Sequence, residues 1–253
     1  YDILEWECET KLADFSFPSH LLPINQFSSL HLNIAQMAGG SSAQPFTSVQ
    51  EFDDWLVRLD GFLGWCDTAM VNMKKGMEQG IVLPKSLAEK VIPQMNELAK
   101  GPVDNHLFYM PIKNVMADFP PAEKERLSIA YQEIIGQRII PTFARLKTFF
   151  EEEYLPACRE SSGISSVPGG RAYYDHQIKV YTTTNMTADE IFDLGEREVA
   201  RLLSEMEKVK AQVGFEGDLK SFFDHVRERK ELMPFKEASE VIANFNAIHE
   251  TMK

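Results

Sequence analysis

The sequence predicts a mainly α-helical protein, an array of long, partly kinked helices joined by loops, with little or no sheet. Three observations lead to this prediction. Apolar residues recur every three or four positions over most of the chain, which is the period of one helix face. Residues that cap helices stand at the start of several of these stretches. Proline and glycine punctuate the segments between them, as in loops that join helices.

The clearest helix is expected from Thr47 to about Gln79. Charged side chains fall between its apolar positions, so one face is apolar and the other is polar. Thr47 or Ser48 can cap the start by accepting a backbone hydrogen bond, and Gly80 can end the helix in a left-handed turn. The apolar face consists of Phe52, Leu56, Leu59, Leu63, Cys66, Met70, Met73 and Met77. Cys66 is therefore expected to be a small core residue.

Two further helices are expected before residue 160. One begins near Ser86 and stops before Gly101. The other begins at Pro121, because the missing N–H of proline has no partner in a first helical turn anyway. Its apolar pattern continues to about Pro156, but Pro141 lies in the middle. A proline inside a helix removes one hydrogen bond and clashes with the preceding turn, so a kink or break is expected at Pro141.

Residues 161–170 are rich in serine and glycine and are expected to form a loop, which is a possible boundary between sub-regions. The stretch Tyr173–Tyr181 that follows is ambiguous. Its aromatic and branched residues suit a short strand, whereas Tyr174, Ile178 and Tyr181 would share one face of a helix. We favour the helix.

Three more helices are expected in the last third of the chain. Thr187 and Glu190 have the spacing of a capping box, in which hydroxyl and carboxylate satisfy the first backbone donors. Later helices begin at Asp218 and after Pro234. The apolar stripe of the last one continues to Lys253, which suggests a chain that is the N-terminal portion of a longer protein. Residues 1–253 are accordingly predicted to be a single helical region.

Composition excludes several classes of function. The formal net charge of the 253 residues is −12, and a field of that sign repels phosphate backbones, so we expect no nucleic-acid partner. No apolar run has the length of a transmembrane segment. The three cysteines are far apart and form no CxxC pair, so no thiolate zinc site is expected.

No complete catalytic or metal-binding motif is found in the sequence. His249-Glu250 begins like a His-Glu-x-x-His zinc helix, but Lys253 stands where the second histidine would be, and an ammonium group cannot replace it. The acids at 151–153 are adjacent on a helix, so their side chains diverge. The sequence therefore predicts no catalytic residue and no metal ligand in this chain.

An ordered set of short motifs resembles a known bacterial family. Glycine and a tyrosine pair occur in 168–174, three threonines in 182–184, and an acid-acid-Ile start with Leu-Gly-x-x-Glu-Val in 189–199. Upstream, the segment 75–84 follows a long helix and ends Gly-Ile-Val-Leu-Pro. Together these resemble the family called domain of unknown function 885 (DUF885), from about Phe46 onward.

The resemblance implies properties that lie partly outside this chain. Members of the family are longer and resemble helical zinc metallopeptidases, with a presumed metal segment of His-Glu followed by Pro-Gly-His in the C-terminal half. No such segment occurs in residues 1–253. The chain would then need no cofactor of its own, zinc would be held by the C-terminal remainder of the same protein, and the chain alone would not be catalytic. Relatives described as exported lipoproteins imply an extracytoplasmic location, periplasmic or lipid-anchored.

The resemblance also implies candidate substrate-binding residues. Gly170, Tyr173 and Tyr174 are expected to border a cleft for a peptide-like substrate, because glycine permits close backbone approach and tyrosine offers an apolar face with a hydroxyl. His176 joins them because it follows the same elements. The alternative is that the tyrosines pack between helices. Two hypotheses remain for the function: a helical portion of a zinc-dependent peptidase that contributes to its substrate cleft, or a non-catalytic helical module that binds a protein or peptide.

Overall fold

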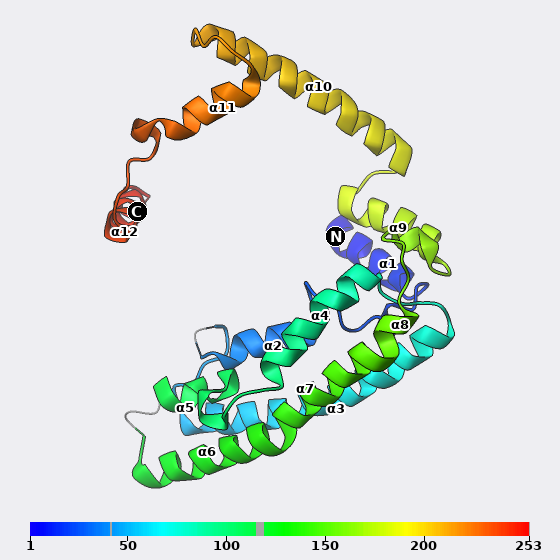
Figure 1. The fold of residues 1–253 in the computed structure, drawn as a ribbon, viewed down its shortest axis with the longest axis vertical. Helices are drawn as coiled ribbons and strands as arrows, with labels where there is room; N and C mark the ends of the chain where they lie inside the picture. Colours follow the sequence, from blue (N-terminus) through cyan, green and yellow to red (C-terminus); the bar gives the residue numbers. More distant parts are fainter. Residues whose placement is uncertain (41, 115–118, 253) are drawn as a thin grey trace. The chain divides into compact units, whose positions relative to one another are not determined.

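The computed structural model describes residues 1–40, 42–114 and 119–252, and all regular secondary structure in these ranges is helical. No β-strand occurs within them; an isolated backbone bridge joins Pro84 and Arg159. The prediction of a mainly α protein is therefore confirmed. Figure 1 shows the helices in sequence colours.

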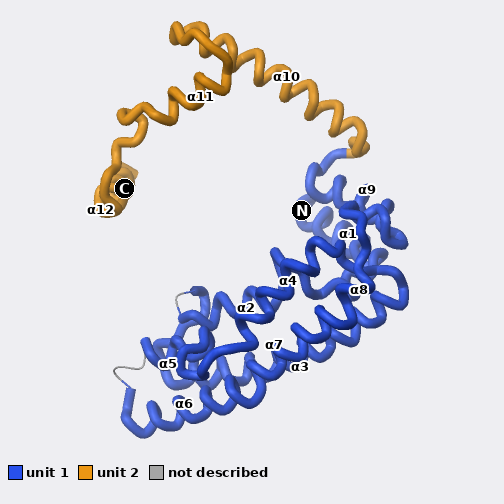
Figure 2. Tube along the Cα trace, in the orientation of Figure 1, with its two compact units in different colours: residues 1–184 blue, residues 185–253 orange. Residues whose placement is uncertain are grey.

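The chain divides into two compact units, Tyr1–Thr184 and Asn185–Lys253, coloured blue and orange in Figure 2. The loop at 161–170 lies inside the first unit and does not separate the two. The reason is that Val167 in this loop is buried in a small apolar cluster with side chains from distant segments. The other members of this cluster are Phe17, Leu21 and Ile81.

Nine α-helices belong to the described part of the first unit, and short 3-10 and π turns join some of them. Their bounds are α1 Asp2–Asp14, α2 Leu30–Ala38, α3 Val49–Glu78, α4 Lys85–Leu98, α5 Met110–Asn114, α6 Pro121–Ile134, α7 Ile140–Thr148, α8 Leu155–Ala157 and α9 Gly170–Thr182. The helices α1, α2 and α5 are absent from the sequence-based prediction.

The longest helix, α3, has the ends that the sequence predicts. Ser48 is its N-cap, and a capping box forms because the Glu51 carboxylate accepts a hydrogen bond from the Ser48 N–H at 3.0 Å. Gly80 follows with φ of +70°, the left-handed conformation expected there. Cys66 is fully buried in its apolar face, and burial raises the pKa of its thiol to about 12.

Of the kink or break expected at Pro141, no break occurs. Helical structure is continuous from Pro121 to Ala157, and we call this run the rod. The rod contains π-helical turns at Ile135–Ile139 and Phe149–Tyr154. The first of these π turns lies immediately before Pro141. Its wider geometry relieves the clash between the proline ring and the carbonyl of the preceding turn. The hydrogen bond that the missing N–H of proline would have donated is then no longer required.

Four ion pairs join α3 to the rod along its length. Their α3 members are spaced seven residues apart, so they lie along one edge of that helix. From one pair to the next, the residue number increases in α3 and also in the rod. The two therefore run parallel. All eight side chains are substantially exposed, so each pair contributes about 0–1 kcal/mol and chiefly fixes the register. The pairs are Asp53–Arg126 (2.8 Å), Asp60–Arg138 (2.6 Å), Asp67–Arg145 (2.9 Å) and Lys74–Glu153 (2.7 Å).

The main core lies between α3, α4 and the rod. Two buried tyrosines of the rod use their hydroxyl groups to bind neighbouring backbone. Tyr131 donates to the carbonyl oxygen of Phe52 at 3.2 Å, and Tyr154 accepts from the N–H of Leu83 at 3.0 Å. The largest fully buried side chains are Trp55, Tyr131, Tyr154, Phe52, Phe108, Phe143 and Phe150.

The second unit consists of α10 Ala188–Gln212, α11 Leu219–Glu228 and α12 Ala238–Thr251. The capping box predicted at Thr187 and Glu190 is present, and Asp218 caps α11. A sharp turn with Gly214 at φ +70° brings Phe215 against Phe222, with ring centroids 5.4 Å apart. None of the described residues of this unit is buried.

Two glycines of α3 give a matched test of how closely neighbouring segments pack on that helix. A Cβ on Gly76 would lie 2.7 Å from the carbonyl oxygen of Ile81 and 3.1 Å from that of Leu21. We expect Gly76→Ala to lower the free energy of unfolding by about 1–3 kcal/mol, because backbone must move. Gly61→Ala meets no atom within 4 Å and should raise stability by ~0.5–1 kcal/mol. Chemical denaturation measures the free energy of unfolding of both variants. Equal changes in the two variants would contradict the close backbone packing at Gly76.

The buried His31 predicts a loss of stability in acid. Its side chain is fully buried beside Ser29, and burial lowers its pKa from 6.5 to about 4. As pH falls below 6.5 the unfolded chain takes up a proton that the folded chain refuses until about pH 4, so folding weakens by up to ~3 kcal/mol over that window. Urea denaturation from pH 7 to pH 4.5 should show a smaller loss for His31→Gln than for the parent. His20→Gln, at an exposed position, should lose as much stability as the parent. If the free energy of unfolding fell equally with pH in all three proteins, His31 would not be the group responsible.

Candidate functional site

The start of α9 is fixed by a glycine that cannot be replaced without backbone movement. Gly169 caps the helix with φ of +72°, and Gly170 is buried. A Cβ on Gly170 would lie 1.8 Å from the carbonyl oxygen of Ile164 and 2.9 Å from the Val167 side chain. The close backbone approach expected at Gly170 is therefore made by the chain's own 3-10 turn at Ile164–Ser166. This contact seats α9 on the loop at 161–170.

Tyr173 faces the N-terminal segment of the chain. Its ring stacks on Phe17 with centroids 4.1 Å apart and planes inclined by 18°, and it packs on the small apolar cluster around Val167. Burial raises the pKa of the Tyr173 hydroxyl, and the negative charge of Asp14 adds to the shift. Tyr173 therefore packs against the segment that follows α1.

His176 and Gln177 also face the N-terminal segment and meet at one carboxylate oxygen. The Nε2 atom of His176 and the Nε2 atom of Gln177 each lie 3.0 Å from Oδ1 of Asp14. The His176 side chain is only 17% exposed. These contacts, with Tyr173 on Phe17, connect α9 to the end of α1. Because α1 has no buried residue of its own, the contacts with α9 account for much of its attachment.

The outer face of α9 carries two exposed tyrosines. Tyr174 is 44% exposed and Tyr181 is 84% exposed, and their spacing of seven residues places them on one side of the helix, two turns apart. Half-buried Ile178 lies between them. Of the four predicted site residues, Tyr174 is thus the one whose ring is open to a ligand. Tyr181 was not predicted as a site residue, although the helical spacing of Tyr174, Ile178 and Tyr181 is visible in the sequence.

The groups around α9 do not assemble a metal site. A zinc site needs three or four ligands, and Asp14 and His176 supply two, with the carboxylate already bound by Gln177. Across the described residues no three side chains of His, Cys, Asp or Glu gather closely enough to hold a metal. Zinc therefore does not fit the part of the chain that the structure describes. The outer face of α9 presents the aromatic rings and hydroxyl groups of Tyr174 and Tyr181.

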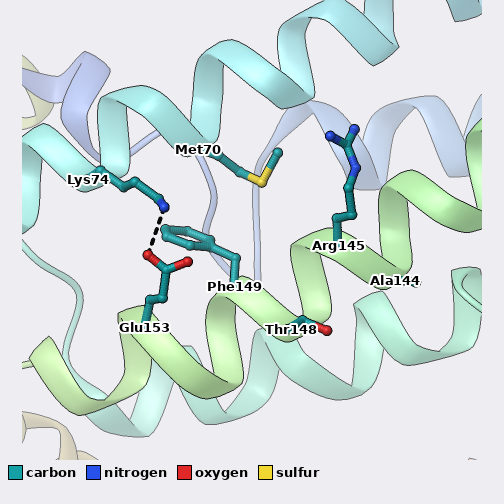
Figure 3. A pocket seen from close by; sticks show the side chains of 7 residues that line it. All are labelled: Met70, Lys74, Ala144, Arg145, Thr148, Phe149 and Glu153. Atoms are coloured by element: carbon teal, nitrogen blue, oxygen red, sulfur yellow. Dashed lines mark ion pairs between the residues drawn. The ribbon is translucent and has the colours of Figure 1, made fainter.

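A second candidate is an open groove between α3 and the rod, with a volume of about 410 Å³ (Figure 3). Figure 3 shows Lys74 and Glu153 paired across one end. The ammonium group of Lys74 lies 5.6 Å from the centre of the Phe149 ring. At the other end Arg145 binds Asp67. The charged groups here already bind one another in the register-setting pairs, and no general base stands beside a nucleophile. We therefore regard α9 as the stronger candidate.

No helix in the described ranges combines the length and apolar character that crossing a membrane requires.

Comparison with known proteins gives a family and a fold. The model of a family described as "Bacterial protein of unknown function (DUF885)" matches residues 1–253. No curated protein matches. A crystal structure described as "the putative lipoprotein from Colwellia psychrerythraea" is similar, with a TM-score of 0.77 and 22% sequence identity. The match covers 90% of this chain and 40% of the other, so this chain spans less than half of the length of that protein.

Replacement of the two neighbouring tyrosines of α9 should affect α1 differently. Tyr173→Ala should release α1, because it removes the stack on Phe17 and opens the apolar cluster, whereas Tyr174→Ala should leave α1 in place. Hydrogen exchange at the amides of α1 should accelerate about tenfold or more in Tyr173→Ala and stay within twofold of the parent in Tyr174→Ala. Equal exchange in the two variants would show that α9 does not hold α1.

Proposed function

The chain belongs to the family of bacterial proteins of unknown function DUF885, and from this premise we propose that it is the helical N-terminal portion of a longer zinc-dependent peptidase. In this proposal α9 borders the substrate cleft, and the metal site lies outside residues 1–253. The chain alone binds part of a peptide-like substrate and does not hydrolyse it.

The observation that carries the proposal is the pair of exposed tyrosines on an anchored helix. Gly170, Tyr173 and His176 fix α9 to the rest of the first unit, which leaves Tyr174 and Tyr181 displayed on its outer face. A tyrosine ring offers apolar area and a hydroxyl at low conformational cost, and a helix that is already ordered loses little entropy on binding. The tyrosines contact the substrate, and the other three residues position them.

Two further findings support the proposal. The similar crystal structure is a protein more than twice as long as the matched region, which leaves room for a metal-binding segment elsewhere in the polypeptide. The description of that similar protein as a lipoprotein supports an extracytoplasmic location for this one.

The rival proposal is a non-catalytic helical module that binds a protein or peptide. The specific observation in its favour is the second unit, whose long helix α10 leaves apolar side chains exposed along one face. The two proposals differ in what the complete gene product does to a peptide.

An assay for hydrolysis of quenched fluorescent peptides by the complete gene product, with and without zinc, distinguishes the peptidase from the binding module. We expect hydrolysis that a chelator abolishes and zinc restores. Tyr174→Ala should raise KM about five- to tenfold and change kcat by less than twofold, because an aromatic contact to bound substrate is lost. Lys179→Ala, exposed on another face of α9, is the control and should match the parent. Peptide binding without any hydrolysis would favour the binding module, and an unchanged KM for Tyr174→Ala would remove α9 from the cleft.

A further inference from the structure

Arg159 lies between the end of the rod and the loop at 161–170, and the segment that joins α3 to α4 fixes its backbone. Its N–H donates to the carbonyl oxygen of Leu83 at 3.2 Å, and its carbonyl oxygen accepts from the N–H of Lys85 at 2.8 Å. These two bonds form the isolated bridge between Pro84 and Arg159. Because Leu83 belongs to the main core, the backbone of Arg159 is held at the edge of that core.

The guanidinium group of Arg159 binds on two sides. Its Nε atom donates to the carbonyl oxygen of Val82 at 3.1 Å, on the side of the core. Its Nη1 atom lies within hydrogen-bonding distance of four oxygens of the loop. These are the carbonyl oxygens of Ser161 and Gly163 and the hydroxyl oxygens of Ser161 and Ser166. The planar fork of an arginine permits contact on both sides, because its donors point in fixed and different directions, whereas a lysine has all its donors on one atom.

The positive charge of this group meets only neutral oxygens. No aspartate or glutamate in the described ranges forms an ion pair with Arg159, whereas four other arginines of the first unit bind carboxylates. Burial lowers the pKa of the Arg159 guanidinium, since the charged form loses part of its hydration. Hydrogen bonds from a charged donor are stronger than neutral ones. The loop oxygens that converge on this charge are therefore held firmly around it.

The loop passes this constraint to the first turn of α9. Gly163, whose carbonyl oxygen accepts from Arg159, is followed directly by Ile164. A Cβ on Gly170 would lie 1.8 Å from the carbonyl oxygen of Ile164, so the backbones of the loop and of the helix are in direct contact. Tyr174 follows Gly170 by about one helical turn. The place of the first turn of α9, and of Tyr174 with it, therefore depends on where the loop is held.

We propose that Arg159 is a positioning residue for the substrate surface of α9. It acts through the loop at 161–170 and not through contact with substrate. It holds the loop on the core, and the loop holds α9 where Tyr174 and Tyr181 contact a bound peptide. This inference rests on the proposed function of α9. Loss of Arg159 lowers the fraction of molecules in which the tyrosines are correctly placed, so the apparent affinity for substrate falls by that fraction and the chemical step is unchanged.

Hydrogen exchange tests the connection without reference to catalysis. In the complete gene product, Arg159→Ala should accelerate exchange at the amides of residues 163–173 about tenfold or more and leave the amides of α3 within threefold of the parent. Arg58→Ala is the matched control, because Arg58 also binds a neutral oxygen, Oε1 of Gln44, and it should leave exchange at residues 163–173 within twofold. Unchanged exchange at residues 163–173 in Arg159→Ala would overturn the proposal.

A milder variant decides the question if Arg159→Ala does not fold. Arg159→Lys keeps the charge and the apolar stem but loses the fork, so it cannot bind Val82 and the loop together. We expect it to accelerate exchange at residues 163–173 at least threefold. Exchange equal to that of the parent would show that the charge alone is sufficient and would overturn the positioning role of the guanidinium.

Peptide hydrolysis separates positioning from a general loss of structure. Arg159→Ala should raise KM about five- to tenfold and change kcat by less than twofold. In a protein that already carries Tyr174→Ala and Tyr181→Ala, the same substitution should change KM by less than twofold, because the residues through which Arg159 acts are gone. A fall in kcat, or a rise in KM of the same size in both backgrounds, would overturn the proposal.

The two kinds of measurement also separate this inference from the proposed function. Unchanged hydrogen exchange in the Arg159 variants refutes the inference even in an active peptidase. Accelerated exchange confined to the loop and α9, in a protein that hydrolyses no peptide, refutes the peptidase alone.

Discussion

The first unit depends on the burial of one face of the thirty-residue helix α3. Without a sheet among the described residues, backbone hydrogen bonds are satisfied almost entirely inside helices, and side-chain packing must join the elements. Burial of one large apolar side chain contributes about 1.5–3 kcal/mol, whereas an exposed ion pair contributes about 0–1 kcal/mol. The aromatic residues under α3 therefore supply most of the stability, and the ion pairs along its edge select the alignment with the rod. At Gly76 even the backbone of neighbouring segments packs on this helix.

Much of this fold follows from local sequence, since a cap and an apolar stripe are local signals. The bounds of α3 and α10 follow from Ser48 and Thr187 with their glutamates. The continuity of the rod does not follow, because Pro141 is accommodated by a π turn whose wider geometry has no sequence signature. The helix α1 was missed for a different reason: it buries none of its residues, so no apolar stripe marks it.

The candidate site shows where sequence reasoning stops. Tyr173 and Tyr174 are the same residue type at adjacent positions, and the family resemblance implies that both border a cleft. Neighbouring side chains on a helix point about 100° apart, so one ring lies on Phe17 while the other is exposed. Which of them turns inward is decided by a residue at the far end of the unit's sequence. The same holds for His176, whose partner Asp14 ends α1.

Arg159 connects the loop below α9 to the helical core of the first unit. Its backbone forms hydrogen bonds with the backbone of Leu83 and Lys85. Its side chain donates to the carbonyl oxygens of Val82 and Gly163. These bonds join the end of the rod and the segment after α3 to the loop that seats α9. The helix that displays the outer tyrosines is thus connected through this arginine to the end of the rod. The position of the tyrosine surface is therefore tied, through hydrogen bonds, to the helical core that holds the rod and α3 together.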